Sequence, residues 1–568
     1  MYGYHGRFLD VDLSARTTQD LPLTEDFCKK YIGGATMAAA LVYDRVSPGM
    51  DPLSPESPLV MATGPFVGTP IPMVSRYAVA GISPLTGYWG EATSGGVFPF
   101  RLKGSGWDGL ILTGRADQPV YLYLKDGRAE IRDASHLWGQ DAYQTQKSIK
   151  AELGDESASV ACIGSAGENM LRYACVVNDK GRVAGRCGLG ALMGSKKLKA
   201  VAAAGNLRPT PADPAKVTEL ARQGVKDINA NLVSVAFREY GTLMYMDMSM
   251  ILGDLPVKYF TKGVFPVEKV SGQSFRQKYT IENYACRGCP IGCGRDLKNF
   301  KPGLDVDGPE YETAAAFGPL CLNSDLDSIV EANHLCNLHG LDTISAGVSV
   351  AYAIHLYEQG VLNQDRVGFK LKWGDPETIL RLTRMIINQE GIGRLLSQGT
   401  LAMARELGRG PDEAAQVKGL EMPLHDARAF HGMAVSYATG PRGACHLKGD
   451  YYNVELGNMV LELMILPGDR LSSVNKGEYA AKYQSLKDLY DALTLCKFCP
   501  LTVTQLGEIL GGITGWKFSP EDLLAAGDRS INLKRAISCK FGLTRADDRL
   551  PGLCLKPLEE GSSAGTRP

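Results

Sequence analysis

The chain has 568 residues and an almost balanced charge, with 61 lysines and arginines against 62 aspartates and glutamates. The net charge of −1 gives no electrostatic reason to expect a nucleic acid or an anionic membrane surface as a partner. At roughly 100 to 200 residues per domain this length predicts about three domains, and 44% hydrophobic residues suffice for buried cores.

The start of the chain, MYGYHGRFLDVDLSART, lacks the basic stretch and apolar run of a secretory signal. No segment reaches the ~18 uninterrupted apolar residues of a membrane-spanning helix. We therefore expect a cytoplasmic protein without a membrane partner. In that reducing compartment the 14 cysteines are expected as free thiols, most of them buried, rather than as disulfides.

Residues 1–208 are rich in glycine, proline and short β-prone runs. The runs at 119–125 (PVYLYLK), 159–163 and 199–204 are typical of strands, because β-branched and aromatic side chains pack well on a pleated surface. This part of the chain therefore predicts a domain built on β-sheet.

Residues 209–417 change to helical patterns. Ser324 and Asp325 can cap a helix that ends near Gly340, and Asp375 followed by Pro376 opens another. Residues 418–568 begin with a mixed, glycine-rich stretch and then become helical again. The predicted fold class is α+β, with an N-terminal β-sheet-rich domain followed by two mostly helical domains.

The last ten residues, EEGSSAGTRP, combine small, charged and glycine residues at a chain terminus. Such a composition offers little apolar surface to bury, and it is typical of ends that are not tied down. We expect these residues to form a disordered tail.

The segment CRGCPIGCGR at 286–295 places Cys286, Cys289 and Cys293 in one tight loop. Thiolates are soft ligands suited to zinc or to an iron–sulfur cluster, and the glycines leave amides free to hydrogen-bond cluster sulfides. A [4Fe–4S] cluster needs one more thiolate, for which Cys496 and Cys499 in DALTLCKFC are candidates. Structural zinc is the alternative, although no nearby Cys or His completes a usual finger spacing.

Further stretches spread over nearly the whole chain carry a family resemblance: YGYHGRFLDVDL, DPLSPESPLVMATGPFVGT, SPLTGYWGEATSGG, EIRDASHLWG, AGRCGLGALMGSKKLKA, GPEYETAAAFGP, EANHLCNLHGLDTIS and RGACHLKGD. With the cysteine motif, they strongly resemble the aldehyde:ferredoxin oxidoreductase family of tungsten pterin enzymes. The resemblance implies a first domain that forms a base for two pyranopterin dithiolene cofactors, which hold tungsten or molybdenum. It also implies a [4Fe–4S] cluster beside one pterin, with Cys496 as its fourth ligand and Cys499 as an extra cysteine.

The resemblance assigns two pterin-binding motifs, D-x-x-G-L-D and D-x-x-G-L-C. They read here as the hexapeptides 337–342 and 491–496, which supply Asn337, Gly340, Leu341, Asp342, Asp491 and Leu495. Two positions depart from the family pattern. Asn337 replaces an aspartate with a neutral amide, which accepts a hydrogen bond but carries no charge. Thr494 replaces a glycine with a β-branched residue.

Other cofactor contacts follow from the same resemblance. Arg76 matches an arginine between pterin and cluster, where a fixed cation can donate hydrogen bonds to both. Thr93 and the backbone carbonyl of Val183 resemble a Mg²⁺ site that bridges the pterin phosphates. The remaining implied pterin contacts are Arg182, Gly185 and Lys448.

Two residues are implied to handle protons. Glu312, in GPEYETAAAFGP, is suited to activate water if burial raises its pKa, and His446, in RGACHLKGD, to hydrogen-bond or protonate the substrate carbonyl oxygen. The metal then takes up two electrons, and the cluster passes them on singly. The expected partners are a small aldehyde or carboxylic acid and a ferredoxin or small iron–sulfur subunit, in a homodimer or hetero-oligomer.

The predicted function is therefore tungsten-dependent, reversible oxidation of an aldehyde to a carboxylic acid. Two alternatives stay open. Cys321 stands where several branches of the family have cysteine, including the tungsten benzoyl-coenzyme A reductases, which reduce an aromatic ring. The chain could instead be a non-catalytic subunit that relays electrons, against which Glu312 and His446 argue.

Overall fold

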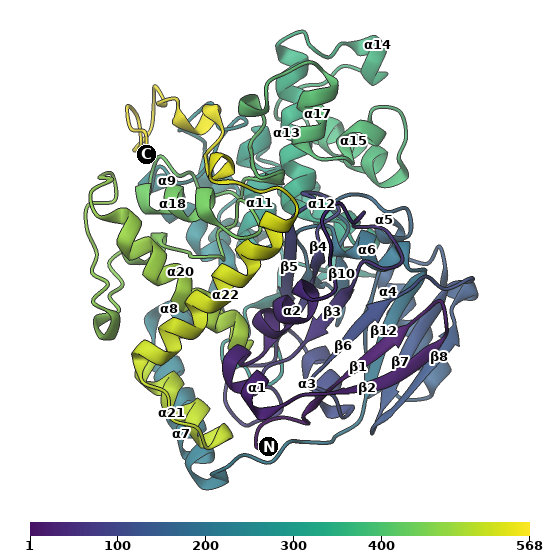
Figure 1. Cartoon of the computed structure of the whole chain (residues 1–568). Coiled ribbons are helices and arrows are strands. Elements are labelled where there is room, and N and C mark those ends of the chain that lie inside the picture. The colour runs from purple at the N-terminus through teal and green to yellow at the C-terminus, as the bar shows by residue number, and fades with distance from the viewer.

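Two six-stranded sheets form the first 204 residues of the computed structural model, which describes residues 1–568 (Figure 1). The first sheet has the order β2-β1-β6-β3-β4-β5, and only β1 and β6 pair in parallel. Its strands are β1 (Arg7–Asp12), β2 (Thr17–Pro22), β3 (Leu59–Ala62), β4 (Tyr77–Ile82), β5 (Trp89–Ser94) and β6 (Gly109–Thr113).

The second sheet has the order β11-β10-β9-β12-β7-β8, in which β7 and β12 pair in parallel. The three predicted strand runs all lie in it as β7, β9 and β12, so these predictions are confirmed. Its strands are β7 (Val120–Lys125), β8 (Arg128–Asp133), β9 (Ser159–Cys162), β10 (Val176–Asn178), β11 (Arg182–Ala184) and β12 (Leu198–Ala204).

Alternate side chains of the first sheet enter two different cores. Leu59 and Met61 join a core shared with the second sheet, whereas Val60 and Ala62 join a core with helices α2 and α22. Successive side chains of a strand point to opposite faces, so a strand buried on both faces has a continuous apolar run. The first sheet therefore lies between the second sheet and the C-terminal helices.

Helices dominate the rest of the chain, together with a three-stranded sheet and a short hairpin, so the predicted α+β class is confirmed. Asp325 caps α12 and Asp375 caps α15, as their sequence patterns predicted. The small strands are β13 (Thr280–Tyr284), β14 (Gly294–Lys301), β15 (Leu304–Asp307), β16 (Gln416–Val417) and β17 (Leu420–Glu421).

The helices, in chain order, are as follows. Six lie in the sheet region: α1 (Glu25–Tyr31), α2 (Gly34–Tyr43), α3 (Phe98–Gly104), α4 (Ala142–Leu153), α5 (Ser165–Glu168) and α6 (Leu189–Ser195). The next eleven are α7 (Pro214–Ala230), α8 (Leu232–Tyr240), α9 (Met246–Leu252), α10 (Gly272–Lys278), α11 (Tyr311–Phe317), α12 (Leu326–His339), α13 (Thr343–Glu358), α14 (Gln364–Val367), α15 (Pro376–Asn388), α16 (Gly393–Leu396) and α17 (Thr400–Glu406). The last five are α18 (His431–Thr439), α19 (Tyr452–Glu455), α20 (Lys476–Leu493), α21 (Val503–Thr514) and α22 (Pro520–Lys540).

Helices α20 and α22 lie side by side and both contact α2 (Figure 1). They approach closely at Gly527, where a Cβ would meet the Ser485 carbonyl oxygen at 1.8 Å. Lys534 of α22 forms buried ion pairs with Glu91 of β5 (2.9 Å) and Asp488 of α20 (2.8 Å). These contacts attach the last long helix to the first sheet. No helix of the chain has both the length and the apolar character that crossing a membrane requires.

The prediction of a disordered C-terminal tail is wrong. Ser563 is fully buried, and its hydroxyl donates to the Gly253 carbonyl (3.0 Å). Thr566 donates to the carbonyl of Arg428 (2.8 Å), a buried arginine that itself donates to the Lys556 carbonyl (2.9 Å). The side-chain hydroxyls of the tail donate hydrogen bonds to the backbone of distant segments, and the composition of the tail does not reveal these partners.

We predict that Ser563→Asp lowers the melting temperature and exposes the tail to protease, because it places an unpaired charge in a fully buried position. The expected loss in the free energy of unfolding is about 1–3 kcal/mol. The neighbouring Ser562 is exposed, so Ser562→Asp is the matched control. Equal melting curves and equal cleavage for both variants would show that the tail contributes nothing to stability.

Candidate active site and cluster site

The cysteines predicted to bind a cluster lie in two loops, one between β13 and β14 and one after α20. Met73, from the sheet region, connects the two loops through its backbone. Its N–H donates to the Gly288 carbonyl (3.4 Å), and its carbonyl accepts from the Cys496 N–H (3.0 Å). The structure therefore brings together loops that are far apart in the sequence.

Cys286, Cys289, Cys293 and Cys496 are all half-buried. Burial raises the pKa of Cys289, and the nearby Cys496 and Cys286 raise it further. Burial also raises the pKa of Cys293 to about 12, against the opposing effect of Arg182. These thiols are therefore protonated at neutral pH unless a metal centre binds them as thiolates.

The spacing of the sulfurs distinguishes the two metal centres that the sequence left open. No three cysteine sulfurs lie within 4.8 Å of one another. A single zinc ion would hold its thiolates about 3.8 Å apart, since each Zn–S bond is about 2.3 Å long. The wider spacing favours an iron–sulfur cluster, whose ligands bind separate iron atoms.

Cys499 lies beside this group but is more buried, at 5% exposed. Its N–H donates to the Cys496 carbonyl (3.0 Å), and burial raises the pKa of its thiol to about 12. Both Cys496 and Cys499 are neighbours of Cys289, but only the half-buried Cys496 is also a neighbour of Cys293.

Arg76, which was predicted to lie between the pterin and the cluster, lies close to Cys286. A Cβ on Gly95 would lie 2.7 Å from the Cys286 sulfur and 3.4 Å from Arg76 Nη1, so the thiol and the guanidinium meet at this glycine. Arg76 Nη2 also donates to Thr93 Oγ1 (3.3 Å). The structure thus brings Arg76, Thr93 and Cys286 together.

Thr93 and Val183, the predicted Mg²⁺ contacts, lie on β5 and β11, which touch each other. A Cβ on Gly185 would contact only the Val183 side chain, at 3.8 Å. At Gly188 and Gly194 it would instead meet backbone oxygens at 1.9 Å. The glycine-rich stretch therefore serves close packing, and Gly185 is the position that leaves room for a ligand.

The first predicted pterin motif forms the turn between α12 and α13. Gly340 ends α12 in the left-handed conformation (φ 69°), and Asn337 and Leu341 are buried beside it. Asp342 caps α13, and its carboxylate also pairs with Arg186 Nε (3.0 Å). The carboxylate is thus held within the protein by the helix start and a buried cation.

The second predicted motif ends α20. Thr494 adopts the left-handed conformation (φ 55°) that glycine adopts more freely, and Leu495 is buried beyond it. Asp491 is also buried, and it pairs with Lys448 and with Lys497 (3.2 Å). Two predicted cofactor residues, Lys448 and Asp491, are therefore direct partners.

Glu312 lies in the first turn of α11 and His446 in the loop after α18. Glu312 Oε1 is 3.3 Å from His446 Nδ1, and their side chains are 12% and 14% exposed. The Leu424 N–H donates to Glu312 Oε2 (2.8 Å), but Oε1 and Nδ1 are buried without a hydrogen-bond partner. Because buried polar atoms are rarely left unpaired, these two atoms are available to a bound molecule.

The pKa values of Glu312 and His446 are shifted in opposite directions. Burial raises the pKa of Glu312, although the nearby His425 opposes the rise. Burial lowers the pKa of His446 well below its usual range, and the cations His425, Arg186 and Arg442 lower it further. At neutral pH His446 is therefore an uncharged ring, and Glu312 is a carboxyl group suited to exchange a proton.

His425 and Asp254 belong to this site, and the sequence did not single them out. His425 Nδ1 is 2.6 Å from Asp254 Oδ2, its Nε2 is 3.5 Å from Glu312 Oε1, and its ring stacks on Tyr452. Burial opposes a charge on His425, but Asp254 and Glu312 outweigh it and raise the pKa. The only available signal was the scarcity of histidine, with 8 in the chain.

Buried guanidinium nitrogens without partners test whether the site fits an anionic cofactor. Arg182 Nε and Nη2, Arg186 Nη1 and Arg442 Nε are all buried and form no hydrogen bond. Arg186 and Arg442 also lie close enough to depress the pKa of His446. Such nitrogens match the phosphates and dithiolenes of pterin cofactors. Arg186 and Arg442 occur inside the sequence stretches GRCGLG and PRGACH, and the sequence reasoning missed both.

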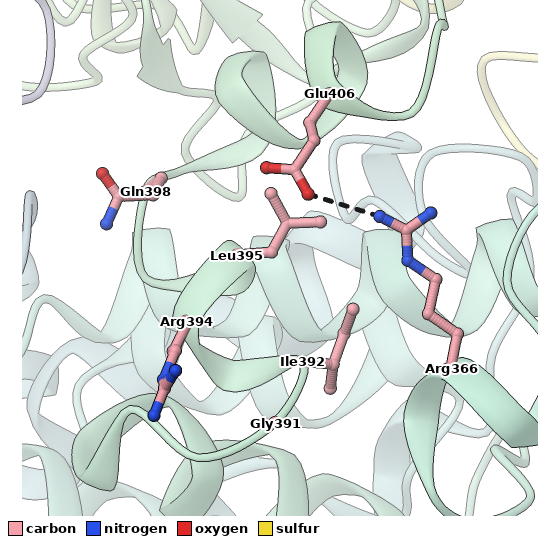
Figure 2. A pocket seen from close by; sticks show the side chains of 7 residues that line it. All are labelled: Arg366, Gly391, Ile392, Arg394, Leu395, Gln398 and Glu406. Carbon is pink, nitrogen blue, oxygen red and sulfur yellow. Dashed lines mark hydrogen bonds and ion pairs between the residues drawn. The ribbon is translucent and has the colours of Figure 1, made fainter.

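A surface pocket elsewhere contains none of these residues. Figure 2 shows it between α16 and its neighbours, with Arg366 paired to Glu406 (3.3 Å) and Arg394 on the opposite side. Its volume is about 300 Å³, and it is lined by Arg366, Gly391, Ile392, Arg394, Leu395, Gln398 and Glu406. It has no nucleophile or thiol, so it adds nothing to the chemistry of the candidate site.

Sequence models of aldehyde ferredoxin oxidoreductases match almost the whole chain. The model of the N-terminal domain matches residues 8–205, and the model of domains 2 and 3 matches residues 219–568. The tungsten-containing aldehyde ferredoxin oxidoreductase of Pyrococcus furiosus is 38% identical over 573 residues, covering 100% of this chain and 94% of that protein. The protein of the same name from Thermococcus kodakarensis is 39% identical, with the same coverage.

Two relatives with other activities are also similar. The WOR-like subunit of an aliphatic sulfonate oxidoreductase from Pyrococcus furiosus is 29% identical, covering 100% of this chain and 92% of that protein. A solved structure, the active site complex BamBC of benzoyl coenzyme A reductase with 1,5-dienoyl-CoA, is similar with a TM-score of 0.86. Its sequence identity is 25%, and the match covers 97% of this chain and 91% of that one.

We predict that Cys496→Ala removes or degrades the cluster in anaerobically purified protein, because the half-buried Cys496 adjoins both Cys289 and Cys293. Cys499→Ala is the matched control and should leave the iron content and the cluster spectrum unchanged. Equal loss of iron in both variants would contradict the choice of Cys496. Iron near zero in the parent protein would contradict the cluster itself.

Proposed function

The chain belongs to the aldehyde ferredoxin oxidoreductase family, and from that premise we propose that it reversibly oxidises an aldehyde to a carboxylic acid. As a member of this family it is a tungsten pterin oxidoreductase with cysteines that bind an iron–sulfur cluster. A [4Fe–4S] cluster held by Cys286, Cys289, Cys293 and Cys496 would supply single-electron transfer to a ferredoxin or a small iron–sulfur subunit. The observation that carries the proposal is the pair of free, facing atoms, Glu312 Oε1 and His446 Nδ1.

Tungsten held by two pyranopterin dithiolenes would supply the two-electron acceptor. Buried, unpartnered nitrogens on three arginines support the fit of such an anionic group. Thr93 and the Val183 carbonyl would hold a Mg²⁺ ion beside the pterin. The proposed pterin contacts are Arg76, Thr93, Arg182, Val183, Gly185, Asn337, Gly340, Leu341, Asp342, Lys448, Asp491 and Leu495. The proposed cluster ligands are Cys286, Cys289, Cys293 and Cys496.

Glu312 acts as the general base. Its Oε2 is fixed by the Leu424 N–H, so Oε1 takes the proton from water as the new C–O bond forms. His446 is uncharged in this buried, cationic surrounding, so its ring donates an N–H to the carbonyl oxygen rather than a full proton. The overall change, RCHO + H₂O to RCOOH, releases two electrons and two protons.

His425 is a positioning residue for Glu312. Asp254 stabilises the protonated form of the His425 ring at Nδ1, and Nε2 of the same ring points toward Glu312. A cation at this distance favours the carboxylate form, which limits the rise in pKa that burial alone would cause. Glu312 is thereby kept able to accept a proton near neutral pH.

Ring reduction is the second candidate, because BamBC shares the fold. The surroundings of Cys321 favour aldehyde oxidation instead. Cys321 is fully buried, and its sulfur donates to the Ala316 carbonyl (3.4 Å), while burial alone raises its pKa. No charged side chain contributes, so this thiol is a core residue. A pure electron-relay subunit would have no need for the Glu312–His446 pair.

We also propose domain boundaries and an oligomeric state. The domains are 1–208, 209–417 and 418–568, although the β16–β17 hairpin spans the second division. The protein assembles as a homodimer or with a small electron-transfer subunit.

We predict that Glu312→Gln slows aldehyde oxidation by roughly 10² to 10⁴ fold, because glutamine keeps the volume and hydrogen bonding but cannot take a proton. Reduction of a viologen dye measures the rate, and tungsten, pterin and iron contents must equal those of the parent. Parent-like turnover at full cofactor content would rule out Glu312 as the base.

A pH profile tests the positioning role. The carboxylate form of Glu312 is the active one, so the rate falls as pH decreases through its pKa, which burial raises. Asp254→Asn removes the charge that supports protonated His425, and it also removes a weaker direct repulsion between Asp254 and Glu312. Loss of the nearby cation is the larger effect, so the acid limb of kcat/KM should move upward by about one pH unit. Asp247→Asn, at an exposed position nearby, is the control. An unmoved acid limb in Asp254→Asn would refute the role of this pair.

A further inference from the structure

Three arginines gather on the surface beside the cysteine loop. Arg208 and Arg287 lie on Phe100, with guanidinium carbons 3.6 and 3.7 Å from the ring centre, and Arg101 adjoins the same ring. Burial and repulsion from Arg287 and Arg101 lower the pKa of Arg208 to about 10. We call these three residues the arginine patch.

The arginine patch has no acidic partner within the chain. Arg101 donates to the Gly205 carbonyl and to Asn206, and Arg208 donates to the Leu207 carbonyl. None of the three forms an ion pair, and mutual repulsion opposes their assembly. Like charges held together without counter-charges cost stability, so they are most readily explained by an anionic partner from outside.

The patch lies where the cysteine loop reaches the surface. Arg287 is exposed between Cys286 and Gly288, and its N–H donates to the Gly96 carbonyl (3.2 Å). Gly95, next to it, adjoins the Cys286 sulfur. Arg287 of the arginine patch thus directly follows Cys286, a proposed ligand of the cluster.

Helix α8 contacts the same loop through its second half, while its apolar first residues are exposed. At the beginning of α8, Leu232, Val233 and Val235 are 83%, 53% and 44% exposed. Further along α8, Arg238 donates to the Pro290 carbonyl of the cysteine loop (3.0 Å), and Phe237 stacks on Phe498 beside Cys496 (4.2 Å). The helix thus covers both cysteine-bearing loops and exposes its apolar start to solvent.

We propose that the arginine patch and the start of α8 form the docking surface for a small, acidic iron–sulfur protein that accepts electrons from the cluster. The proposal rests on the proposed function, since each aldehyde oxidised yields two electrons. Each electron passes to one oxidised partner molecule, whose cluster is reduced. Arginines supply attraction and orientation, and a few apolar side chains supply the desolvated contact, as in small transient interfaces.

The test compares charge variants of the holoenzyme with a purified acidic [4Fe–4S] ferredoxin. Arg287→Glu, and the milder Arg208→Gln/Arg287→Gln, should weaken ferredoxin binding about 10- to 100-fold at low salt and flatten its salt dependence. Leu232→Asp should weaken binding with the salt dependence retained. Arg394→Glu, on an exposed arginine of the pocket in Figure 2, is the matched control and should bind as the parent does.

A second measurement separates docking from chemistry. Aldehyde-dependent reduction of benzyl viologen should be undiminished in every variant with full iron content. By contrast, kcat/KM for ferredoxin should fall in the arginine variants and in Leu232→Asp, but not in Arg394→Glu. If the parent oxidises no aldehyde with either acceptor, the proposed function fails. The docking proposal can still be tested in that case, because ferredoxin binding is measured directly and needs no turnover. Unchanged ferredoxin binding in both patch variants would overturn the proposal. A changed oligomeric state in sedimentation, with ferredoxin binding intact, would overturn it too and assign the surface to contacts between copies.

Discussion

Neutralisation of three buried carboxylates is the constraint on which the rest of the structure depends. Oxygens of Glu91, Asp488 and Asp491 lie within 4.8 Å of one another, on β5 and α20, and all three side chains are buried. Such a group can exist only if cations are placed between its members, because an unpaired buried charge is far costlier than a paired one. Lys448 and Lys534 meet that need by bridging pairs of these carboxylates.

This ionic group determines how the sheet region and the C-terminal helices fit together. Lys534 is on α22, and Lys448 is in the same loop as His446, so the position of the histidine that we propose to be catalytic depends on the group. Asp491 lies in the last turn of α20, shortly before the loop that carries Cys496. The charges thus fix three features at once: the contact of the last long helix with β5, the loop that presents His446, and the loop that carries Cys496.

The sequence predicted features that depend on local chemistry. Strands β7, β9 and β12 and the caps Asp325 and Asp375 follow from short patterns, and the family was evident from motifs along the chain. The pair of Asp254 and His425 could not be predicted, because the two residues are 171 positions apart and neither belongs to a distinctive pattern. The ordered tail was missed for the same reason, since Ser563 and Gly253 are 310 positions apart. The roles of the individual site residues stay predictions, because the motifs name residue types but no bound group.

The two hydrogen bonds that connect the cysteine loops through the Met73 backbone constrain the order of events during synthesis. During synthesis the loop with Cys286, Cys289 and Cys293 leaves the ribosome well before α20 and Cys496. Until then Met73 lacks one of its two loop partners, and three thiols stand without the fourth. Domains generally fold as they emerge, from the N-terminus onward. A cluster held by both loops must therefore be inserted after translation is nearly complete, and the early thiols need protection from oxidants and stray metal ions in the meantime.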